Sequence, residues 1–284
     1  MTAPIVTTRA ALREMTRGWH KTGDCIGVVP TMGALHDGHL SLVTRAKEMS
    51  DRVIVTIFVN PKQFNNPDDL ENYPRTEHED AHKLERFEVD AIYVPDGAQM
   101  YPDGFATTVS VDGLTNVLCG AHREGHFDGV ATVVTKLFTQ TSADLAFFGE
   151  KDFQQLQVVR RLALDLDLGV EVVGCPTIRE IDGLAMSSRN LLLSDQARSR
   201  AAALNEVMED MAEALGRGAE FCSLLPDAHA RLASAGFGDI DYLEMRTKDT
   251  LTLIERATEP ARLFAAAYMA GVRLIDNIDV PRAL

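Results

Sequence analysis

The 284-residue chain has room for two modest domains, and its hydrophobic fraction of 45% is enough for well-buried cores. A formal net charge of -14 and a pI near 5.0 exclude broad electrostatic capture of nucleic acid or anionic membranes, because both need a positive field. The four cysteines form no CxxC pair, so free thiols in a reducing compartment are expected instead of a zinc knuckle or a redox dithiol.

The N-terminal sequence, MTAPIVTTRAALREMTRGW, contains spread charges and no continuous apolar segment. A secretory signal has such a segment, and a membrane-spanning helix needs about 20 apolar residues in a row. No stretch of the chain approaches that length. The sequence therefore predicts a cytoplasmic protein that does not bind membranes.

Short apolar, β-branched runs follow one another along the chain: CIGVV, RVIVTIFV, DAIYVP, ADLAFF and VEVVGCPTI. Stretches with helical periodicity separate most of them, and they predict helices at about 38–49, 76–87, 127–140 and 150–165. Such alternation is typical of parallel strands joined by crossover helices. The fold class expected is α/β, with a Rossmann-like doubly wound parallel sheet.

The pattern changes after REIDGLAMSSRN. Ser194 is expected to cap a long helix rich in Ala, Glu and Leu that ends in GRG near 216–218. A strand, IDYLEMR, and a hairpin, RLFAAAYM-AG-VRLIDNI, follow. The sequence thus predicts a second, smaller α+β domain, with the division at 1–178 and 179–284.

The stretch TMGALHDGHL places two histidines where the first buried strand turns into a helix. In an open α/β sheet this turn offers free backbone N–H groups and a positive helix end, which suit a phosphate. His36 and His39 share one helix face, so both imidazoles can stabilise charge on the same anionic group. Surface or core-lining histidines are an alternative, and a zinc pair lacks a nearby third ligand. There is no Walker A loop and no GxGxxG.

A second polar cluster, FFGEKDFQQLQVVRR, follows another buried strand. Lys151 supplies a point charge for a phosphate, Asp152 can accept ribose hydroxyls and Gln155 can orient a polar substrate. In the alternative interpretation these residues form a solvated first helical turn, whose acidic side chains complement the helix dipole.

The loop MSSRN combines small hydroxyl donors with an arginine. Ser187 and Ser188 can bond phosphate oxygens while Arg189 forks across them, and a loop between two domains can close over a ligand. A capping loop is the alternative use of these residues.

The long segment FVNPKQFNNPDDLENYPR places Asn60, Gln63 and Tyr73 at the carboxyl edge of the second strand, where their polar groups suit a hydroxylated carboxylic acid. The segment CGAHREGHFDGVATVV pairs His122 with His126. Glu124 is misplaced for the HExxH motif, so we interpret this pair as a non-zinc feature.

Five ordered motifs carry a family resemblance: PTMGALHDGH, FVNPKQF with YPRT, GHFDGVATVV, FGEKDFQQ and SSRN. Together they resemble the pantoate–β-alanine ligases (pantothenate synthetases) over most of residues 25–195. This family belongs to a wider nucleotidyltransferase group, whose HIGH motif is similar to HDGH and whose KMSKS loop is similar to MSSRN.

The resemblance implies a two-step reaction of coenzyme A biosynthesis. The carboxylate of (R)-pantoate attacks the α-phosphate of ATP and pyrophosphate leaves; the amine of β-alanine then captures the pantoyl adenylate and releases AMP. Mg²⁺ would enter with ATP and neutralise the leaving pyrophosphate. The family likeness also implies a homodimer, no tightly bound cofactor, and a lid role for the C-terminal domain.

The resemblance also implies the site residues. ATP contacts fall on Met32, Gly33, Ala34, Leu35, His36, Asp37, Gly38, His39, Gly149, Glu150, Lys151, Asp152, Ile178, Met186, Ser187, Ser188 and Arg189. Pantoate contacts fall on Asn60, Gln63, Arg123 and Gln155, and Gln63 also faces β-alanine. The catalytic residues expected are His36, His39, Lys151 and Arg189, with His39 as proton donor. Glu124 and Leu192 depart from the family pattern beside the motifs.

Three other functions are weighed against ligation. A nucleotidyltransferase that stops at transfer, such as a CMP-forming one, shares the HxGH signature but does not need the acid contacts of FVNPKQF and GEKDFQQ. A regulatory ATP-binding module would need the phosphate site without the amide-rich acid pocket. A tRNA synthetase is disfavoured by the acidic charge and by the absence of an anticodon-binding extension.

Overall fold

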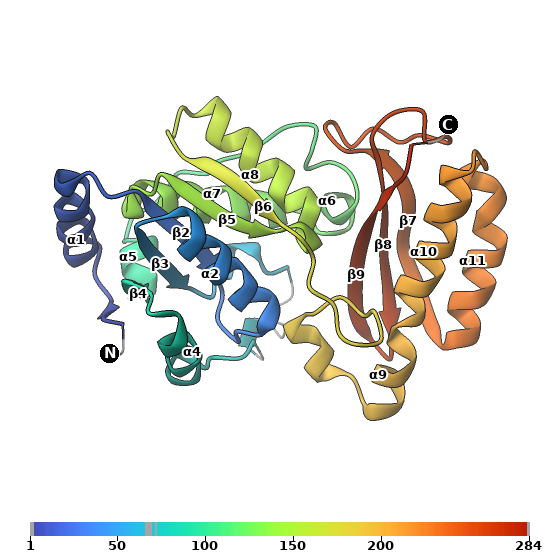
Figure 1. Cartoon of the computed structure of the whole chain (residues 1–284), viewed down its shortest axis with the longest axis horizontal. Coiled ribbons are helices and arrows are strands. Elements are labelled where there is room, and N and C mark those ends of the chain that lie inside the picture. The colour runs from blue at the N-terminus through green and yellow to red at the C-terminus, as the bar shows by residue number, and fades with distance from the viewer. Residues whose placement is uncertain (1–2, 66–69, 72, 283–284) are drawn as a thin grey trace. The chain divides into compact units, whose positions relative to one another are not determined.

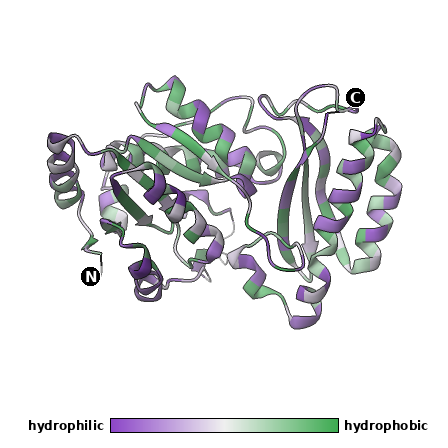
Figure 2. Cartoon of the chain, viewed as in Figure 1, coloured by the Kyte–Doolittle hydropathy of each residue, from purple (hydrophilic) through white to green (hydrophobic). Residues whose placement is uncertain are grey.

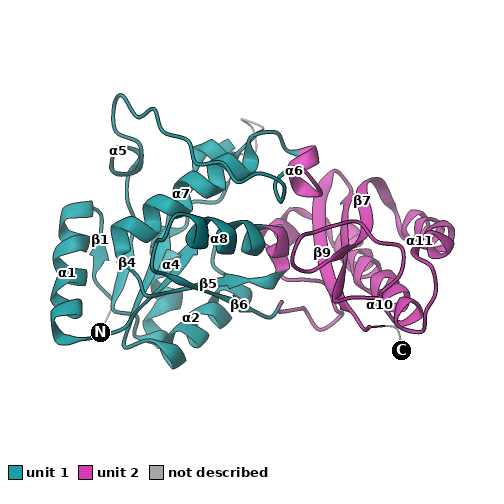
Figure 3. Cartoon of the chain, turned by 90° about the horizontal axis from the view of Figure 1, so that it is seen from above, with its two compact units in different colours: residues 1–115, 123–150, 155–176 teal, residues 116–122, 151–154, 177–284 magenta. Residues whose placement is uncertain are grey.

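The computed structural model describes residues 3–65, 70–71 and 73–282, and it divides into two compact units (Figure 3). Unit 1 comprises residues 1–115, 123–150 and 155–176, and unit 2 comprises residues 116–122, 151–154 and 177–284. Two short segments that precede residue 155 thus belong to the second unit. The division into domains at residue 178 and the lid role stay predictions.

Unit 1 is built on a six-stranded parallel sheet (Figure 1). The strand order is β1-β4-β3-β2-β5-β6, and every neighbouring pair is parallel. The strands are β1 Ile5–Val6, β2 Ile26–Thr31, β3 Arg52–Ile57, β4 Ala91–Tyr93, β5 Leu145–Gly149 and β6 Glu171–Cys175. The order reverses between β2 and β5, which is where ligands bind in such sheets. The predicted fold class is confirmed.

The helices of unit 1 are α1 Arg9–Thr22, α2 Asp37–Met49, α4 Glu77–Leu84, α5 Gly97–Met100, α7 His126–Thr141 and α8 Phe153–Asp165. Two 3₁₀ turns accompany them, η1 Pro61–Gln63 and η2 Glu85–Phe87. A third, η3 Glu150–Asp152, begins in unit 1, while its last two residues and the first two of α8 belong to unit 2. The predicted helix at 76–87 therefore ends in a 3₁₀ turn, after which Glu88 is left-handed with φ 48°. The predicted helix at 150–165 likewise opens with a 3₁₀ turn before α8.

Burial explains why the apolar runs form strands. Val28, Val29, Val53 and Ile54 are fully buried, as expected for a sheet covered on both faces. Leu40, Val43 and Ala46 of α2 join this core. Figure 2 shows the central strands as hydrophobic, while hydrophilic residues alternate with hydrophobic ones along the helices.

Unit 2 contains a three-stranded antiparallel sheet in the order β7-β8-β9. Its elements are α6 Cys119–His122, η4 Ser188–Leu192, α9 Asp195–Ala201, α10 Ala203–Gly216, α11 Phe221–Ala235, β7 Phe237–Thr247, β8 Ala261–Met269 and β9 Val272–Val280. Ala270 and Gly271 join β8 to β9 with φ values of 49° and 81°, which matches the type I′ turn of a two-residue hairpin. The predicted hairpin is thereby confirmed.

The long helix expected after Ser194 is two helices, α9 and α10. Ser194 caps α9 as expected, since its hydroxyl accepts from the backbone N–H of Ala197. The run is interrupted at Ala202, which keeps helical angles of φ −61° and ψ −23°. The prediction of one continuous helix is therefore wrong at a single residue, Ala202, where α9 ends and α10 begins. Apolar residues of α10 and α11 then pack on one face of the antiparallel sheet.

Candidate active site

The loop after β2 makes a tight turn that only certain residues tolerate. Gly33 has φ +86° and Ala34 has φ +51°, both in the left-handed region. A Cβ on Gly33 would lie 3.1 Å from a carboxylate oxygen of Asp80 and 3.3 Å from Ile57 Cγ2. A side chain at this position would therefore combine backbone strain with crowding.

A buried carboxylate holds this loop. Asp80 of α4 is 0% exposed, and its two oxygens accept from the backbone N–H groups of Ala34, at 2.9 Å, and Leu35, at 2.8 Å. The hydroxyl of Thr76 donates to the same carboxylate at 3.0 Å. Lys83 Nζ donates to the carbonyl oxygen of Leu35 at 2.7 Å and lies 4.0 Å from Asp80.

This carboxylate corrects one sequence-based expectation. The turn was expected to present free N–H groups to a phosphate, but those of Ala34 and Leu35 already donate to Asp80. The N–H of Gly33 donates to Thr31 Oγ1 at 3.2 Å. The backbone of the loop is thus used to fix its shape, because a carboxylate that accepts backbone N–H bonds makes strong, charge-assisted contacts.

The two histidines at the start of α2 lie together, as their spacing predicts. Their ring centroids are 4.1 Å apart with an interplanar angle of 41°. The backbone N–H of His36 donates to His39 Nδ1 at 3.4 Å. A backbone N–H can only donate, so Nδ1 of His39 is the unprotonated nitrogen, and the proton of the neutral imidazole is on Nε2. The neighbouring Asp37 is exposed.

Gln63 lies next to this loop on η1. Its amide nitrogen donates to Met32 Sδ at 3.0 Å, and its amide oxygen accepts from Asn60 Nδ2 at 3.0 Å. Asn60 is only 1% exposed and also bonds the carbonyl oxygen of Gly129, Tyr101 OH and the N–H of Lys62. Asn60 therefore orients Gln63, and its own polar atoms are occupied within the protein.

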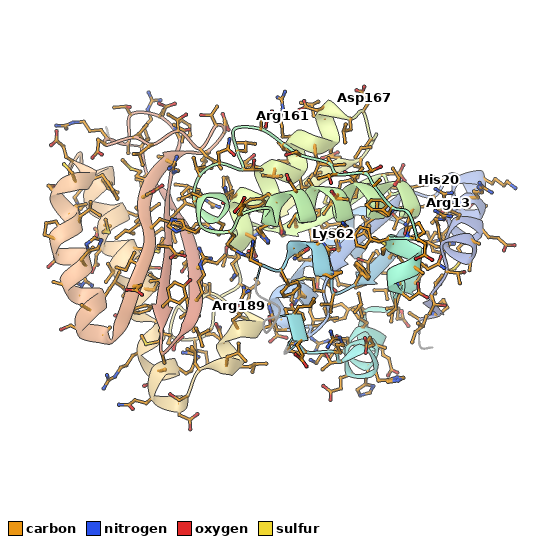
Figure 4. All side chains as sticks on the ribbon, turned by 180° about the vertical axis from the view of Figure 1, so that it is seen from behind. Arg13, His20, Lys62, Arg161, Asp167 and Arg189 are labelled. Carbon is orange, nitrogen blue, oxygen red and sulfur yellow. The ribbon has the colours of Figure 1, made fainter. Side chains whose placement is uncertain are left out.

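Helix α7 supports η1. The carbonyl oxygen of Gln63 accepts from His126 Nδ1 at 2.8 Å and from an Arg123 guanidinium nitrogen at 3.2 Å. A Cβ on Gly129 would lie 2.2 Å from the carbonyl oxygen of Lys62, so only glycine allows this close approach. The ammonium of Lys62, which Figure 4 labels, lies 5.2 Å from the centre of the Tyr101 ring. Three of the five motifs thus meet within unit 1.

The motif GEKDFQQ contributes to unit 2 through residues 151–154. The side chain of Lys151 is 18% exposed, and its ammonium lies 3.8 Å from Asp152, which is 48% exposed. Gln154 is 5% exposed and bonds the backbone of Cys119 and Val117 at 3.0 Å and 2.7 Å. Gln154 is thus structural, whereas Gln155, the predicted pantoate ligand, is half-buried in unit 1.

The motif SSRN ends a small hairpin of unit 2. The N–H of Met186 donates to the carbonyl oxygen of Ile178 at 2.9 Å, so two predicted ATP contacts are paired through their backbones. Ser187 Oγ caps η4 by accepting from the N–H of Arg189 at 3.3 Å. No side-chain partner holds the Arg189 guanidinium among the described residues, and Figure 4 marks this side chain. The capping role and a phosphate role are therefore compatible.

The sequence analysis did not single out Thr76, the last residue of YPRT, or Asp80, which follows it in α4. A pocket in unit 1 lies beside them at the carboxyl ends of β3 and β4. Its lining residues are Met32, Gly33, Ile57, Phe58, Val59, Arg75, Thr76, Glu77, Val94 and Pro95. The two histidines that imitate a metal motif have separate partners: His126 bonds Gln63, and His122 lies 3.7 Å from Asp241.

The described part of the chain holds no group of three or more His, Cys, Asp or Glu residues arranged to bind a metal ion. Within the same residues, every helix is too short or too polar to cross a membrane.

Comparison with known proteins gives one consistent result. The profile of the family "Pantoate-beta-alanine ligase" matches residues 4–279. A pantothenate synthetase of Roseobacter denitrificans is 68% identical over 283 residues, which is 100% of both chains.

Solved structures agree with these sequence matches. A pantothenate synthetase from Thermus thermophilus is 43% identical with a TM-score of 0.92, and the match covers 98% of this chain and 99% of that one. A pantoate-beta-alanine ligase from Francisella tularensis, solved with beta-gamma ATP and beta-alanine, is 34% identical with a TM-score of 0.84 over 98% and 97% of the two chains. The chain belongs to the pantoate–β-alanine ligase family, and it is an AMP-forming ligase that condenses pantoate with β-alanine at the expense of ATP.

Proposed function

We propose that His39 acts in the first half-reaction by donating a hydrogen bond from Nε2 to the α-phosphate of ATP. The observation that carries this role is the bond from the His36 N–H to His39 Nδ1, because it leaves the proton on Nε2. Charge builds up on the phosphate as the pantoate carboxylate attacks. A donor already oriented toward that charge stabilises the transition state without reorganisation. His36, whose ring lies 4.1 Å away, assists on the same phosphate.

Gln63 and Gln155 hold pantoate. The amide of Gln63 is fixed by Met32 and Asn60, so its contacts to the substrate carry little entropic cost. Asn60 and Arg123 act through Gln63, the former on its amide and the latter on its carbonyl oxygen. This assigns them a positioning role in place of the direct pantoate contact expected from the family resemblance.

The remaining cationic and hydroxyl groups bind the phosphates. Lys151 supplies a partly desolvated charge, and Ser187, Ser188 and Arg189 supply donors for a phosphate chain. The nucleotide enters as the Mg²⁺ complex of ATP. The hard cation prefers phosphate oxygens and water to a dedicated all-protein site.

In the second half-reaction the amine of β-alanine attacks the acyl carbonyl carbon of the adenylate. The C–N bond forms, the C–O bond to AMP breaks, and the amine loses a proton. Gln63 also faces β-alanine in this step. The Francisella tularensis relative, whose structure contains beta-gamma ATP and beta-alanine, supports both ligands for this chain.

Assembly and location complete the proposal. By resemblance to the family, the proposal includes a cytoplasmic homodimer formed through the N-terminal part of the chain. Light scattering at micromolar concentration would test the dimer, and a monomeric mass would overturn it.

The role of His39 is tested with two amide substitutions that resemble different halves of the imidazole. The side-chain amide of His39→Gln reaches the position of Nε2, whereas that of His39→Asn stops near Nδ1. We expect His39→Gln to retain about tenfold more activity than His39→Asn in pantothenate formation. Equal losses in both variants, or activity of His39→Ala within about threefold of wild type, would contradict the role.

A further inference from the structure

Strand β9 carries two adjacent, buried polar residues in the sequence IDNI. Asp276 and Asn277 are each 4% exposed. Adjacent residues of a strand point to opposite faces of the sheet. The face of Asp276 is the one covered by α10 and α11, since Leu274 and Ile278 pack there. The face of Asn277 carries Phe264, its register partner on β8.

Asn277 holds the segment that contains Lys151. Its amide nitrogen donates to the carbonyl oxygen of Lys151 at 2.7 Å. Two further contacts of the same sheet fix Phe153, because Arg262 stacks on its ring at 4.2 Å and Phe264 packs on it at 6.0 Å. All of these residues belong to unit 2. Residues 151–154 are therefore held by the C-terminal sheet.

Asp276 holds the hairpin that leads to SSRN. Its carboxylate accepts two bonds from the guanidinium of Arg179, at 2.6 Å and 2.9 Å. Arg179 also donates to the carbonyl oxygen of Gly183 at 3.0 Å and bridges to Ala185 in the hairpin. The pair is bidentate, and its carboxylate is buried, since the side chain of Asp276 is 2% exposed and that of Arg179 is 23% exposed.

We propose that Asp276 and Asn277 are positioning residues for adenylation, Asn277 through Lys151 and Asp276 through Arg179 and the 186–189 segment. This inference depends on the phosphate-binding roles proposed above for Lys151 and Arg189. One strand thus sets the place of two cationic side chains, which come from segments far apart in the sequence.

Position matters here because the two groups stabilise charge at a distance. A misplacement of about 1 Å in a catalytic group can cost about 10²-fold in rate. A merely structural role would instead reduce folding stability and leave the rate of the folded enzyme unchanged. The rate of the first turnover, measured on folded protein, separates the two cases.

The test of Asn277 uses the apolar isostere Asn277→Leu, which keeps the side-chain volume and removes the donor. We expect pyrophosphate release in the first turnover to fall by about 10-fold to 100-fold at saturating ATP and pantoate. In a Lys151→Met background the same substitution should cause no further loss, because its effect passes through the lysine. Arg246→Met is the matched control: it removes a buried side chain of β7 that bonds the carbonyl oxygen of Leu251. It should reduce the melting temperature without slowing release.

Three results would overturn the role of Asn277. The first is release within about threefold of wild type in Asn277→Leu while Lys151→Met is inactive, and this leaves the role of Lys151 intact. The second is an equal loss in the two backgrounds. The third is an active Lys151→Met variant, which removes the proposed role of Lys151 and with it that of Asn277.

The test of Asp276 needs a variant that still folds, because Asp276 without Arg179 would be a buried, unpaired charge. The double replacement Asp276→Leu with Arg179→Met removes both charges, a change that is often neutral for stability. We expect it to slow pyrophosphate release by about tenfold, and to have no added effect in an Arg189→Ala background. An unchanged rate of pyrophosphate release in the double variant would overturn the proposed role of Asp276.

Discussion

Each unit of the molecule fixes its site residues with a buried aspartate, but the two aspartates work differently. Asp80 of unit 1 accepts from backbone N–H groups of Ala34 and Leu35, 46 and 45 residues away within the same unit. Asp276 of unit 2 pairs with the side chain of Arg179, 97 residues away. The first contact shapes a loop directly, and the second ties down a hairpin through a side chain.

Because the two aspartates have different partners, we expect the two units to respond differently when the aspartate is replaced. Uncharged backbone donors tolerate an amide in place of the carboxylate at moderate cost, whereas a buried aspartate without its arginine is an uncompensated charge. Unit 1 therefore has a loop whose shape is tuned by one acceptor. Unit 2 has a charge pair whose members must be kept or replaced together.

The largest effect is expected from Lys151→Met, which removes the unit 2 charge whose segment is held by Asn277. Adenylation should fall by about 10³-fold, because one lost electrostatic contact of this kind costs about 10²–10³. The melting temperature should change little, since the ammonium makes only one ion pair, at 3.8 Å, among the described residues. Lys248→Met, in the same unit, is the control. Activity of Lys151→Met within about threefold of wild type would contradict the account.

Asp80→Asn asks whether the loop of unit 1 depends on its carboxylate. The amide keeps the volume but replaces one acceptor by a donor, which then faces a backbone N–H. We expect a loss of about 1–3 kcal/mol in the free energy of unfolding and a fall of about 10-fold to 100-fold in kcat/KM.

Asp90→Asn is the matched control for the loop. Asp90 accepts from the backbone N–H of Val53 at 2.9 Å, at the start of β3 and not at the carboxyl end of the sheet. It should lower stability by a similar amount with kcat/KM unchanged. Equal losses of kcat/KM in both variants would show that the loop has no special role.

Gly129→Ala tests the contact between α7 and η1. Alanine usually favours a helix over glycine by about 0.5–1 kcal/mol, but here its Cβ would lie 2.2 Å from a backbone oxygen. We expect the steric clash to outweigh the gain in helix propensity and to destabilise the fold by about 1–3 kcal/mol. Because Gln63 moves with η1, the KM for pantoate should rise about tenfold.

Gly18→Ala is the control, and we expect it to increase stability where Gly129→Ala reduces it. Gly18 lies in α1, where an added Cβ meets nothing within 4 Å. This variant should be stabilised by about 0.5–1 kcal/mol and keep its KM. A stable Gly129→Ala variant with a normal KM would mean that η1 does not depend on the close contact.

The smallest effect is expected at Tyr101, which donates to Asn60 Oδ1 at 2.7 Å. Burial raises the pKa of the Tyr101 phenol well above its usual range, so the group remains a neutral donor. Tyr101→Phe should cost about 1–2 kcal/mol of stability and raise the pantoate KM about threefold. Tyr93→Phe removes a similar bond, to Gln140 Oε1 at 2.7 Å, and should cost stability without a change in KM. Equal KM values in the two variants would show that the hydrogen bond from Tyr101 to Asn60 does not help to orient Gln63.

Sequence patterns predict the parallel sheet because its strands are continuous apolar runs. They do not predict β1, which has only two residues, or α11, in which Pro226 looks like a break. The sequence also gives no sign of the break at Ala202, because the alanines on both sides of it favour a helix.

Some site residues could likewise be predicted from the sequence, and others could not. His36, His39 and Gln63 stand out because unusual polar residues follow buried strands. Asp80 does not, because Glu77, Glu79 and Asp80 together look like a solvated first turn, and only the fold shows which carboxylate is buried. Asp276 and Asn277 are hidden for a related reason. In an antiparallel strand with alternating polar residues, a buried polar pair looks like an exposed one.

The central claim is that the anchored side chains act on the α-phosphate before any amine is present. Exchange of labelled pyrophosphate into ATP, measured with pantoate and without β-alanine, tests it most directly. Wild-type enzyme should show exchange that disappears when pantoate is omitted, and His39→Ala, Lys151→Met and Asn277→Leu should lose exchange in proportion to product formation. If these variants kept full exchange while losing only pantothenate formation, the residues would act in the second step and the account would be wrong.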